Sequence, residues 1–189
     1  MSSVIGIDEV GRGCWAGPLV VVAAKAHTEL PDGLADSKEL TRAQREAFLQ
    51  LLEATCHLGE GWVTASEIDN LGLTAATKLA VARALRALSA RADDEIIMDG
   101  HLNYCPTEFL NVRCVIDGDR LHPIVSAASI VAKVRRDRFM GEQAQLFPDY
   151  AFEKHVGYGT ARHRAALKDF GICELHRKSY KPIKEFLTV

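Results

Sequence analysis

The chain has 189 residues, 48% of them hydrophobic, and its 23 basic and 25 acidic residues give a net charge of -2. This length and composition allow one sizeable core, so we predict a single domain spanning residues 1–189, with the segment from about residue 147 acting as a cap on that core. The nearly neutral charge excludes a globally basic nucleic-acid binder, and any such binding must come from local basic patches.

The cysteines and the apolar runs indicate the compartment. The five cysteines form no Cys-x-x-Cys pair, which argues against a zinc site or a disulfide framework. Residues 1–3 do not begin a basic region followed by an apolar core, and the longest apolar run, 19–24, is too short to span a bilayer. We therefore expect a reduced, cytoplasmic protein without a membrane partner.

The first predicted element is a short buried strand that ends in two acids. Residues 4–7 are apolar, and Asp8 and Glu9 follow at once. An acidic pair in this position is often a turn or a helix cap, but burying it requires cations that neutralise it. The turn Gly11-Arg12-Gly13 then offers close backbone approach and a guanidinium that can bind a phosphate in a bidentate manner. The segment is typical of a site for metal and phosphate.

The elements that follow predict an α/β fold. We expect a second strand over 19–24, antiparallel to the first, and a capping box at Thr41 that starts a helix to about residue 53. A third strand is predicted over 56–64, and apolar residues at helical spacing predict a long helix over about 74–90.

Further strands again end in or before acids. Residues 95–99 form a predicted strand that ends in Asp99, and a strand over 112–116 precedes Asp117-Gly118-Asp119. Pro123 is placed to begin a helix that continues towards residue 140, with small residues that allow close packing on the sheet. After a break at 147–150, Thr160 is expected to cap a last helical segment that ends near Gly171.

Carboxylates at the ends of several strands predict a metal-dependent reaction. In an open α/β sheet, ligands gather beyond the carboxyl ends of the strands, where Asp8, Glu9 and Asp99 are expected. Asp117 and Asp119 are both available as a fourth acid, and spacing does not choose between them. Converging acids repel one another unless cations bind, and oxygen ligands favour Mg²⁺ or Mn²⁺. Two such ions suit phosphodiester hydrolysis.

The alternation of side chains along a strand qualifies this prediction. Neighbouring residues of a regular strand point to opposite faces, so Asp8 and Glu9 cannot both face one cleft unless the strand ends or bulges there. Alternatively, Glu9 contributes through its backbone carbonyl group.

Two clusters of basic residues are candidates for nucleic-acid contacts. Residues 133–138 are equally well explained as the solvated face of a helix, and 154–184 contain eight lysines and arginines. Lys38 and Lys133 are possible phosphate contacts, or Lys133 pairs with Asp137 on a helix. Three histidines in the second cluster are expected to be phosphate contacts or surface residues rather than catalytic groups: His155, His163 and His176.

Taken in order, the motifs resemble those of the ribonuclease HII family over nearly the whole chain, from residue 4 to about residue 180. The motifs are Gly6-Ile7-Asp8-Glu9-Val10-Gly11-Arg12-Gly13, Asp36-Ser37-Lys38, Met98-Asp99-Gly100, Asp119 followed by residues 125–133, and Gly157-Tyr158-Gly159-Thr160. The resemblance implies a ribonuclease H-like fold, a mixed five-stranded sheet flanked by helices with a helical C-terminal cap. It also implies cleavage of RNA strands in RNA/DNA hybrids and of single ribonucleotides in duplex DNA, as in ribonucleotide excision repair. Cutting on the 5' side of the ribonucleotide leaves a 3'-hydroxyl and a 5'-phosphate.

The resemblance also assigns residues. It implies that Asp8, Glu9, Asp99 and Asp119 are the catalytic acids and hold two Mg²⁺ or Mn²⁺ ions when substrate is bound. It implies that Gly11, Arg12 and Gly13 contact the ribonucleotide and its 2'-hydroxyl, and that Tyr158 packs at the RNA-to-DNA junction. Outside its motif, Tyr158 would be taken for an ordinary half-buried tyrosine.

This chain departs from the family pattern at two places. Asp117 stands where the family usually has a basic residue, and Cys14-Trp15 replaces a sequence led by proline, for which we expect altered packing rather than altered chemistry.

Two alternative functions differ from this prediction. A catalytically silent hybrid-binding protein would keep the fold, but all the acids are present. Ribonuclease HIII carries an extra amino-terminal domain, whereas here the first strand is expected from residue 4. The expected active form is a monomer.

Overall fold

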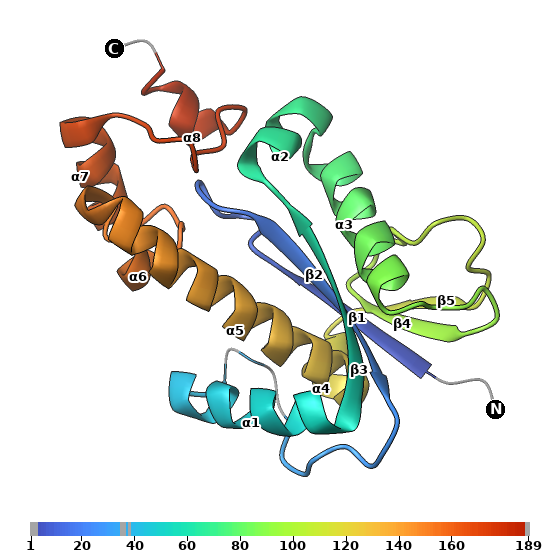
Figure 1. Ribbon diagram of the computed structural model, residues 1–189. Helices are drawn as coiled ribbons and strands as arrows, with labels where there is room; N and C mark the ends of the chain where they lie inside the picture. Colours follow the sequence, from blue (N-terminus) through green and yellow to red (C-terminus); the bar gives the residue numbers. More distant parts are fainter. Residues whose placement is uncertain (1–3, 35–36, 38, 188–189) are drawn as a thin grey trace.

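The computed structural model describes residues 4–34, 37 and 39–187 (Figure 1). Its strands are β1 (Val4–Val10), β2 (Leu19–Ala26), β3 (Cys56–Val63), β4 (Glu95–Asp99) and β5 (Val112–Val115). Its helices are α1 (Arg42–Thr55), α2 (Ala65–Leu71), α3 (Leu73–Ala87), α4 (Gly118–Leu121), α5 (Pro123–Leu146), the 3-10 turn η1 (Pro148–Tyr150), α6 (Phe152–His155), α7 (Ala161–Phe170) and α8 (Lys181–Lys184).

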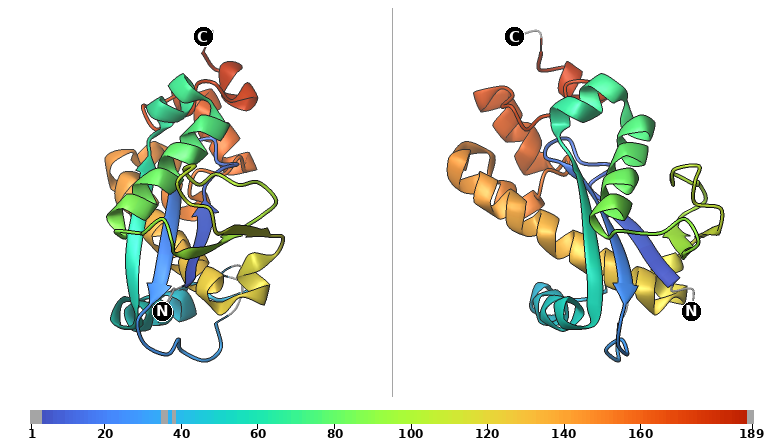
Figure 2. Two further views of the ribbon diagram at one scale, coloured as in Figure 1. Left: turned by 90° about the vertical axis from the view of Figure 1, so that its right-hand side faces the viewer. Right: turned by 45° about the vertical axis from the view of Figure 1, so that its right-hand side comes forward.

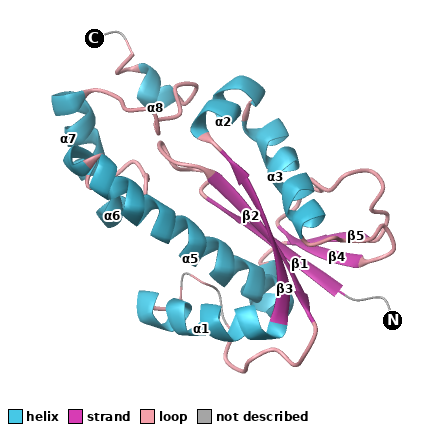
Figure 3. Cartoon of the chain, viewed as in Figure 1, coloured by secondary structure: helices cyan, strands magenta, loops and turns pink. Residues whose placement is uncertain are grey.

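The strands form one mixed sheet in the order β3-β2-β1-β4-β5 (Figure 3). The first two strands are antiparallel neighbours, as predicted, and β3 continues the antiparallel part. On the other side of β1, the strands β4 and β5 run parallel to it. The carboxyl ends of β1, β4 and β5 therefore meet at one edge, and the expected mixed five-stranded sheet is confirmed.

Helices cover both faces of the sheet, with α3 on one side and α1 and α5 on the other (Figures 1 and 2). Ile5 and Ile7 pack into the core beneath α3, whereas Val22 and Ala24 pack into the core beneath α1 and α5. Because side chains alternate along a strand, strands buried on both faces need continuous apolar runs. This is why residues 4–7 of β1 and 19–24 of β2 are continuously apolar or glycine.

Helix starts agree with the capping signals, and the short helices α2, α4, α6 and α8 were not predicted. The side chain of Thr41 accepts a hydrogen bond from the backbone of Gln44 and completes the predicted capping box. The helix predicted over about 74–90 is α3, and α2, which was not predicted, precedes it and meets it at Gly72. Gly72 has a φ of 76°, which glycine adopts readily and which breaks the helix. The second capping box, at Thr64, was the missed signal.

The C-terminal elements pack around the far end of α5. Met140 of α5, Phe152, Leu167 and Ile183 are buried together with Ala16 of the β1–β2 turn. This apolar cluster holds the C-terminal elements against the β1–β2 turn, although they are more than 100 residues away in sequence. Within the described part of the chain, no helix combines the length and apolar character needed to cross a bilayer.

Candidate active site

Asp8 and Glu9 point to opposite faces of the sheet because β1 keeps a regular register with β2 through Val10. Gly6 lies on the same face of the sheet as Asp8, and an added Cβ at Gly6 would lie 2.3 Å from the carbonyl oxygen of Ile124 in α5. Asp8 therefore lies under α5 and is buried. Glu9, on the other face, is partly exposed and forms an ion pair of 3.2 Å with Arg12. No bulge is needed for both carboxyl groups to reach the end of the strand.

Asp99 comes next to Asp8 through the pairing of parallel strands. Ile7 pairs with Met98, so the residues that follow, Asp8 and Asp99, are neighbours at the carboxyl edge. The carboxylate of Asp99 accepts a hydrogen bond of 2.8 Å from the backbone of Gly118. This contact ties the end of β4 to α4, which carries Asp119.

Asp117 and Asp119 are separated by their environments. Asp119 is buried in α4, whereas Asp117 is exposed and adopts a left-handed conformation with a φ of 55°. The hydroxyl group of Ser126 donates to the carbonyl oxygen of Asp119 at 2.5 Å. Asp119 thus lies on the inner side of the turn and is the better candidate for the fourth acid.

The neighbouring acids act on Asp8 electrostatically. Burial raises the pKa of Asp8 well above its usual range, and the charges of Glu9 and Asp99 raise it further. Hydrogen bonds from Ser129 and from the backbone of Glu9 act in the opposite direction but do not cancel the effect. A carboxylate in this position is stabilised as an anion by a nearby cation.

The turn after β1 is held by protein contacts on one side and is open on the other. Gly11 has a φ of 92°, and an added Cβ there would lie 2.4 Å from Nε of Arg136. The carbonyl oxygen of Arg12 accepts hydrogen bonds from Arg177 at 2.9 Å and from Tyr180 at 2.6 Å. By contrast, an added Cβ at Gly13 would meet nothing within 4 Å. Gly11 is therefore required by packing, whereas the space at Gly13 is free for a ligand.

The guanidinium group of Arg12 is partly exposed and contacts two side chains. One guanidinium nitrogen contacts Glu9, and another donates to the hydroxyl group of Tyr104 at 3.1 Å. Tyr104 is nearly buried in the β4–β5 loop. The sequence offered no motif that could have identified it.

The loop that carries Tyr158 packs against the same turn. An added Cβ at Gly157 would lie 2.2 Å from the carbonyl oxygen of Ala16, and one at Gly159 would lie 2.1 Å from the ring of Trp15. The backbone of Trp15 donates to the carbonyl oxygen of Gly157 at 2.8 Å. The two glycines that flank Tyr158 thus allow two distant loops to touch, and Trp15 fills the contact. This contact is where the packing beside Cys14-Trp15 is predicted to differ from the family pattern.

A cavity of about 330 Å³ unites most of the candidate residues. Its lining comprises Asp8, Glu9, Val10, Gly11, Arg12, Gly13, Ser37, Ser129, Lys133 and Tyr158. A small second cavity of about 30 Å³ contains Asp99 together with Glu9, Arg12 and Tyr104. Glu9 and Arg12 line both. The structure therefore brings the predicted substrate residues to one hollow, with Asp99 in the small cavity beside it, whereas Asp119 lines neither of these two cavities and is buried in α4.

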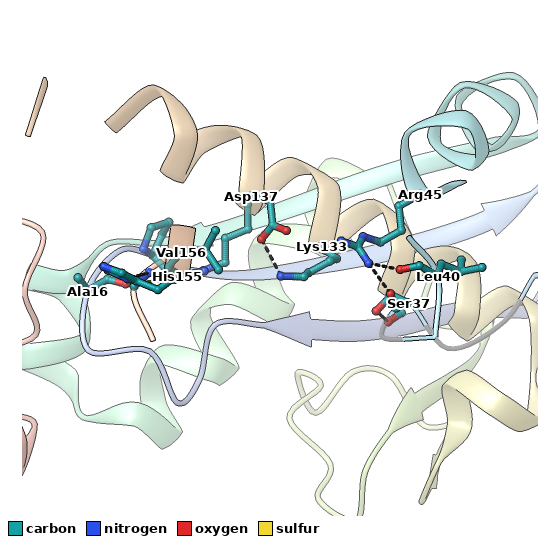
Figure 4. Close-up of polar contacts among 12 residues, drawn as sticks. Ala16, Ser37, Leu40, Arg45, Lys133, Asp137, His155 and Val156 are labelled. Carbon is teal, nitrogen blue, oxygen red and sulfur yellow. Dashed lines mark hydrogen bonds and ion pairs between the residues drawn. The ribbon is translucent and has the colours of Figure 1, made fainter. Parts of the chain in front are cut away.

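Basic and hydroxyl side chains complete the wall formed by α5. Lys133 binds Asp137 at 2.8 Å, the helical ion pair that the spacing allowed (Figure 4). Ser37 and Ser129 share a hydrogen bond of 2.9 Å. Sequence reasoning missed both serines as site residues, although each lies inside a quoted motif. Asp36 and Lys38 of the first of these motifs lie outside the described residues.

The carboxylates are close in pairs but do not form a finished metal cage. Among residues 4–34, 37 and 39–187, no three acidic, histidine or cysteine side chains are arranged to hold an ion. Asp8 and Asp99 accept hydrogen bonds from backbone N–H groups, and Glu9 is paired with Arg12. The chemistry of the donor set nevertheless suits a divalent cation, because all the donors are oxygens and the charges of Glu9 and Asp99 still raise the pKa of Asp8.

The predicted surface position of three histidines is wrong. His155, His163 and His176 are buried in the C-terminal part and hydrogen-bonded to one another or to the backbone. Two arginines from the clusters of basic residues, Arg136 and Arg177, are also fully buried. A sequence rich in charge suggests a solvated surface, but these groups find partners in loops that are distant in the chain.

The comparisons with known proteins agree with the motifs. A profile described as Ribonuclease HII matches residues 5–183. The chain is 42% identical over 185 residues to Ribonuclease HII of Jannaschia sp., covering 97% of this chain and 92% of that protein. It is 43% identical over 191 residues to Ribonuclease HII of Burkholderia cenocepacia, covering 98% and 86%.

Solved structures confirm the expected ribonuclease H-like fold. The enzyme in the PCNA:RNase HII complex from Archaeoglobus fulgidus superposes with a TM-score of 0.79 at 27% identity, covering 95% of both chains. Ribonuclease H2 from Pyrococcus horikoshii gives 0.76 at 25% identity, covering 97% and 96%. Bst-RNase HIII in complex with Mn²⁺ gives 0.73 at 21% identity, covers 98% of this chain and 69% of that one, and supports the fold alone.

Proposed function

Because the chain belongs to the ribonuclease HII family, we propose that it hydrolyses the RNA strand of RNA/DNA hybrids and cuts on the 5' side of single ribonucleotides embedded in duplex DNA. Membership makes it a ribonuclease H type hydrolase. The proposed products are a 3'-hydroxyl and a 5'-phosphate, and the proposed role is removal of ribonucleotides from DNA. A monomer acting in the cytoplasm, where its five free cysteines stay reduced, fits this role.

One observation carries the proposal of metal-assisted hydrolysis. Asp8 is buried beside Glu9 and Asp99, and its pKa is raised by burial and by their charges. We propose that Asp8, Glu9, Asp99 and Asp119 hold the ions. When bound, a pair of Mg²⁺ or Mn²⁺ ions supplies an activated water and stabilises the leaving oxygen.

The remaining residues of the cavity suit a nucleic-acid backbone. The open space at Gly13 allows a sugar to approach the backbone, where N–H and carbonyl groups can recognise a 2'-hydroxyl. Arg12, poised between Glu9 and Tyr104, supplies a guanidinium for a phosphate. Tyr158, which is 42% exposed, offers a ring against which a base or sugar can pack.

The test is cleavage of a duplex that contains one ribonucleotide. The parent chain should cut it in Mg²⁺ or Mn²⁺ and leave it intact in EDTA. Asp8→Asn and Asp99→Asn should each reduce cleavage by at least about 100-fold, because each removes charge at the site of ion binding. End mapping should place the cut on the 5' side of the ribonucleotide.

A control variant shows whether the loss of cleavage is specific to the proposed acids. Asp117→Asn, at an exposed acid in the same region, should cut within about twofold of the parent chain, as expected for a surface change. Robust cleavage in EDTA, or full activity of Asp8→Asn, would contradict the proposed mechanism.

A further inference from the structure

Three buried histidines lie directly behind the loop that carries Tyr158. His155 ends α6, His163 lies in the first turn of α7, and His176 belongs to the segment between α7 and α8. The rings of His155 and His163 stack with centroids 4.4 Å apart. Nε2 of His163 lies 3.0 Å from Nε2 of His176. The proposed function uses none of these groups.

The hydrogen bonds define where each proton lies. The backbone N–H of Cys173 donates to Nδ1 of His176 at 2.9 Å, which makes this nitrogen an acceptor; its contacts with the thiol and the carbonyl oxygen of Cys173, at 3.2 and 3.3 Å, are longer. A neutral imidazole carries one proton, which in His176 must then be on Nε2 and is donated to Nε2 of His163. Nδ1 of His163 consequently carries a proton and donates it to the carbonyl oxygen of Tyr158 at 2.9 Å. All the donors point the same way, towards Tyr158.

The surroundings favour the neutral rings that this chain of bonds requires. Burial lowers the pKa of His163 and of His176 to about 4. Tyr150 and Phe152 pack against the rings. His155 accepts the backbone N–H of Gly157 at Nδ1, so its own proton lies on Nε2, which donates to the carbonyl oxygen of Tyr150.

The backbone next to Tyr158 depends on such outside support. Val156 has a φ of 44° and Gly157 a φ of 89°, a conformation that is unfavourable for the valine. The Tyr158 carbonyl oxygen also accepts the backbone N–H of Thr160 at 2.8 Å. The direction of this carbonyl group fixes the start of the Tyr158 side chain, which lines the main cavity.

We propose that His163 is a positioning residue for substrate recognition, in which its Nδ1–H tautomer, locked by His176, holds the Tyr158 backbone so that the ring faces the cavity. The inference rests on the proposed role of Tyr158 in binding the substrate. The nitrogens of the three rings contact one another, backbone groups and the thiol of Cys173, and no group in the described part of the chain is arranged to hold an ion, so the cluster orients a loop.

The first experiment measures the network itself and does not depend on activity. In the ¹⁵N-labelled full chain at neutral pH, imidazole nitrogen shifts should show His163 protonated at Nδ1 and His176 protonated at Nε2. A coupling between the two Nε2 nuclei should be visible through the hydrogen bond. The opposite tautomer of His163, or a charged ring on either residue, would overturn the proposal.

The second experiment uses two matched variants at the same position. In His163→Asn the amide nitrogen takes the place of Nδ1 and can still donate to Tyr158, whereas in His163→Gln it takes the place of Nε2 and cannot. Loss of one hydrogen bond predicts about tenfold slower cleavage at single ribonucleotides for His163→Gln. His163→Asn should stay within about twofold of the parent chain, because it keeps the bond that matters.

A double-variant comparison shows whether the effect passes through Tyr158. In a Tyr158→Ala background, His163→Gln should cause no further loss. An equal loss in both backgrounds would overturn the proposal.

Failure of the proposed function can be told apart from failure of this inference. If the parent chain cut no ribonucleotide-containing duplex at all, the proposed function would fail, while the nitrogen shifts would still show whether the histidine network exists. If His163→Gln did not fold, the imidazole nitrogen shifts of the parent chain and the activity of His163→Asn would still test the proposal.

Discussion

Arg136 is a residue whose role only the fold reveals. Its guanidinium is fully buried and donates to the backbone carbonyl groups of Pro18, Val156 and Ala16 at 2.8, 2.7 and 3.1 Å. These carbonyl groups belong to the two loops that border the cavity. Because the planar guanidinium presents five donors in a fixed fork, one side chain can join both loops to α5.

Removing this arginine should destabilise the protein strongly. Arg136→Met keeps much of the volume but leaves three carbonyl groups without their donor, and each buried unsatisfied group is costly. We expect the free energy of unfolding to fall by about 3 kcal/mol or more, measured by urea titration.

The matched control is another arginine of the same helix. Arg138 pairs with Glu46 and is partly exposed, so Arg138→Met should cost less than about 1 kcal/mol. Equal losses in the two variants would show that Arg136 does not join the loops as described.

At the scale of elements, glycines set the distance between helices and sheet. Gly6 of β1 faces the backbone of α5, and Gly61 of β3 faces the backbone of α3, where an added Cβ would lie 1.8 Å from the carbonyl oxygen of Ala80. The helices therefore contact the sheet backbone directly. The position of α5 over β1 is what places Ser129 and Lys133 at the cavity with Asp8.

A single methyl group should disturb this contact. In Gly6→Ala the added carbon would lie 2.3 Å from the backbone of Ile124, so α5 must move away from the sheet. We expect a loss of about 1–3 kcal/mol in the free energy of unfolding, together with slower cleavage because Asp8 and Ser129 separate.

Gly141 offers the control within the same helix. An added Cβ there meets nothing within 4 Å, and alanine is a better helix former than glycine. Gly141→Ala should therefore raise stability by about 0.5–1 kcal/mol. Gly6→Ala with parental stability would contradict the close contact between α5 and β1.

At the scale of the whole molecule, the C-terminal part closes one side of the candidate site. The buried histidines hold the Tyr158 loop, and Arg177 donates to the carbonyl oxygens of Gly17 and Arg12. The last segments of the chain thereby support the turn that follows the first strand. We therefore expect that a change which destabilises the C-terminal part also alters the geometry of the site.

The histidines predict how stability depends on pH. An unfolded histidine titrates near pH 6.5, whereas burial lowers the pKa of His163 and of His176 to about 4. Between these values the unfolded chain binds more protons, so the stabilisation is complete above about pH 6.5 and is lost as the pH falls towards 4. Urea titrations at about pH 7 and about pH 5 should show this loss.

A matched variant assigns the loss to these rings. The cluster is also influenced by His155, on which Glu153 and Arg162 act, and by Cys173, on which Glu174 acts. A double variant, His163→Asn with His176→Asn, keeps those groups and should lose less stability between the two pH values than the parent chain. An unchanged pH dependence would show that other groups cause it.

Local and periodic features were predictable from the sequence. The apolar runs, the capping box at Thr41 and the stop at Gly171 predicted the strands and the longer helices α1, α3, α5 and α7, because hydrogen bonding and burial within a short segment decide them. Carboxylates at the ends of strands also indicated the site, since parallel strands bring their carboxyl ends to one edge.

The tertiary structure decided the contacts between distant segments. The sequence did not reveal that Arg136 and Arg177 are buried, that Tyr104 contacts Arg12, or that three histidines form a network behind Tyr158. It also left the choice between Asp117 and Asp119 open. The burial of Asp119 and the exposure of Asp117 favour Asp119. Burial and hydrogen-bond partners arise only when loops far apart in the chain pack together, so a polar side chain's surroundings cannot be inferred from its neighbours in sequence.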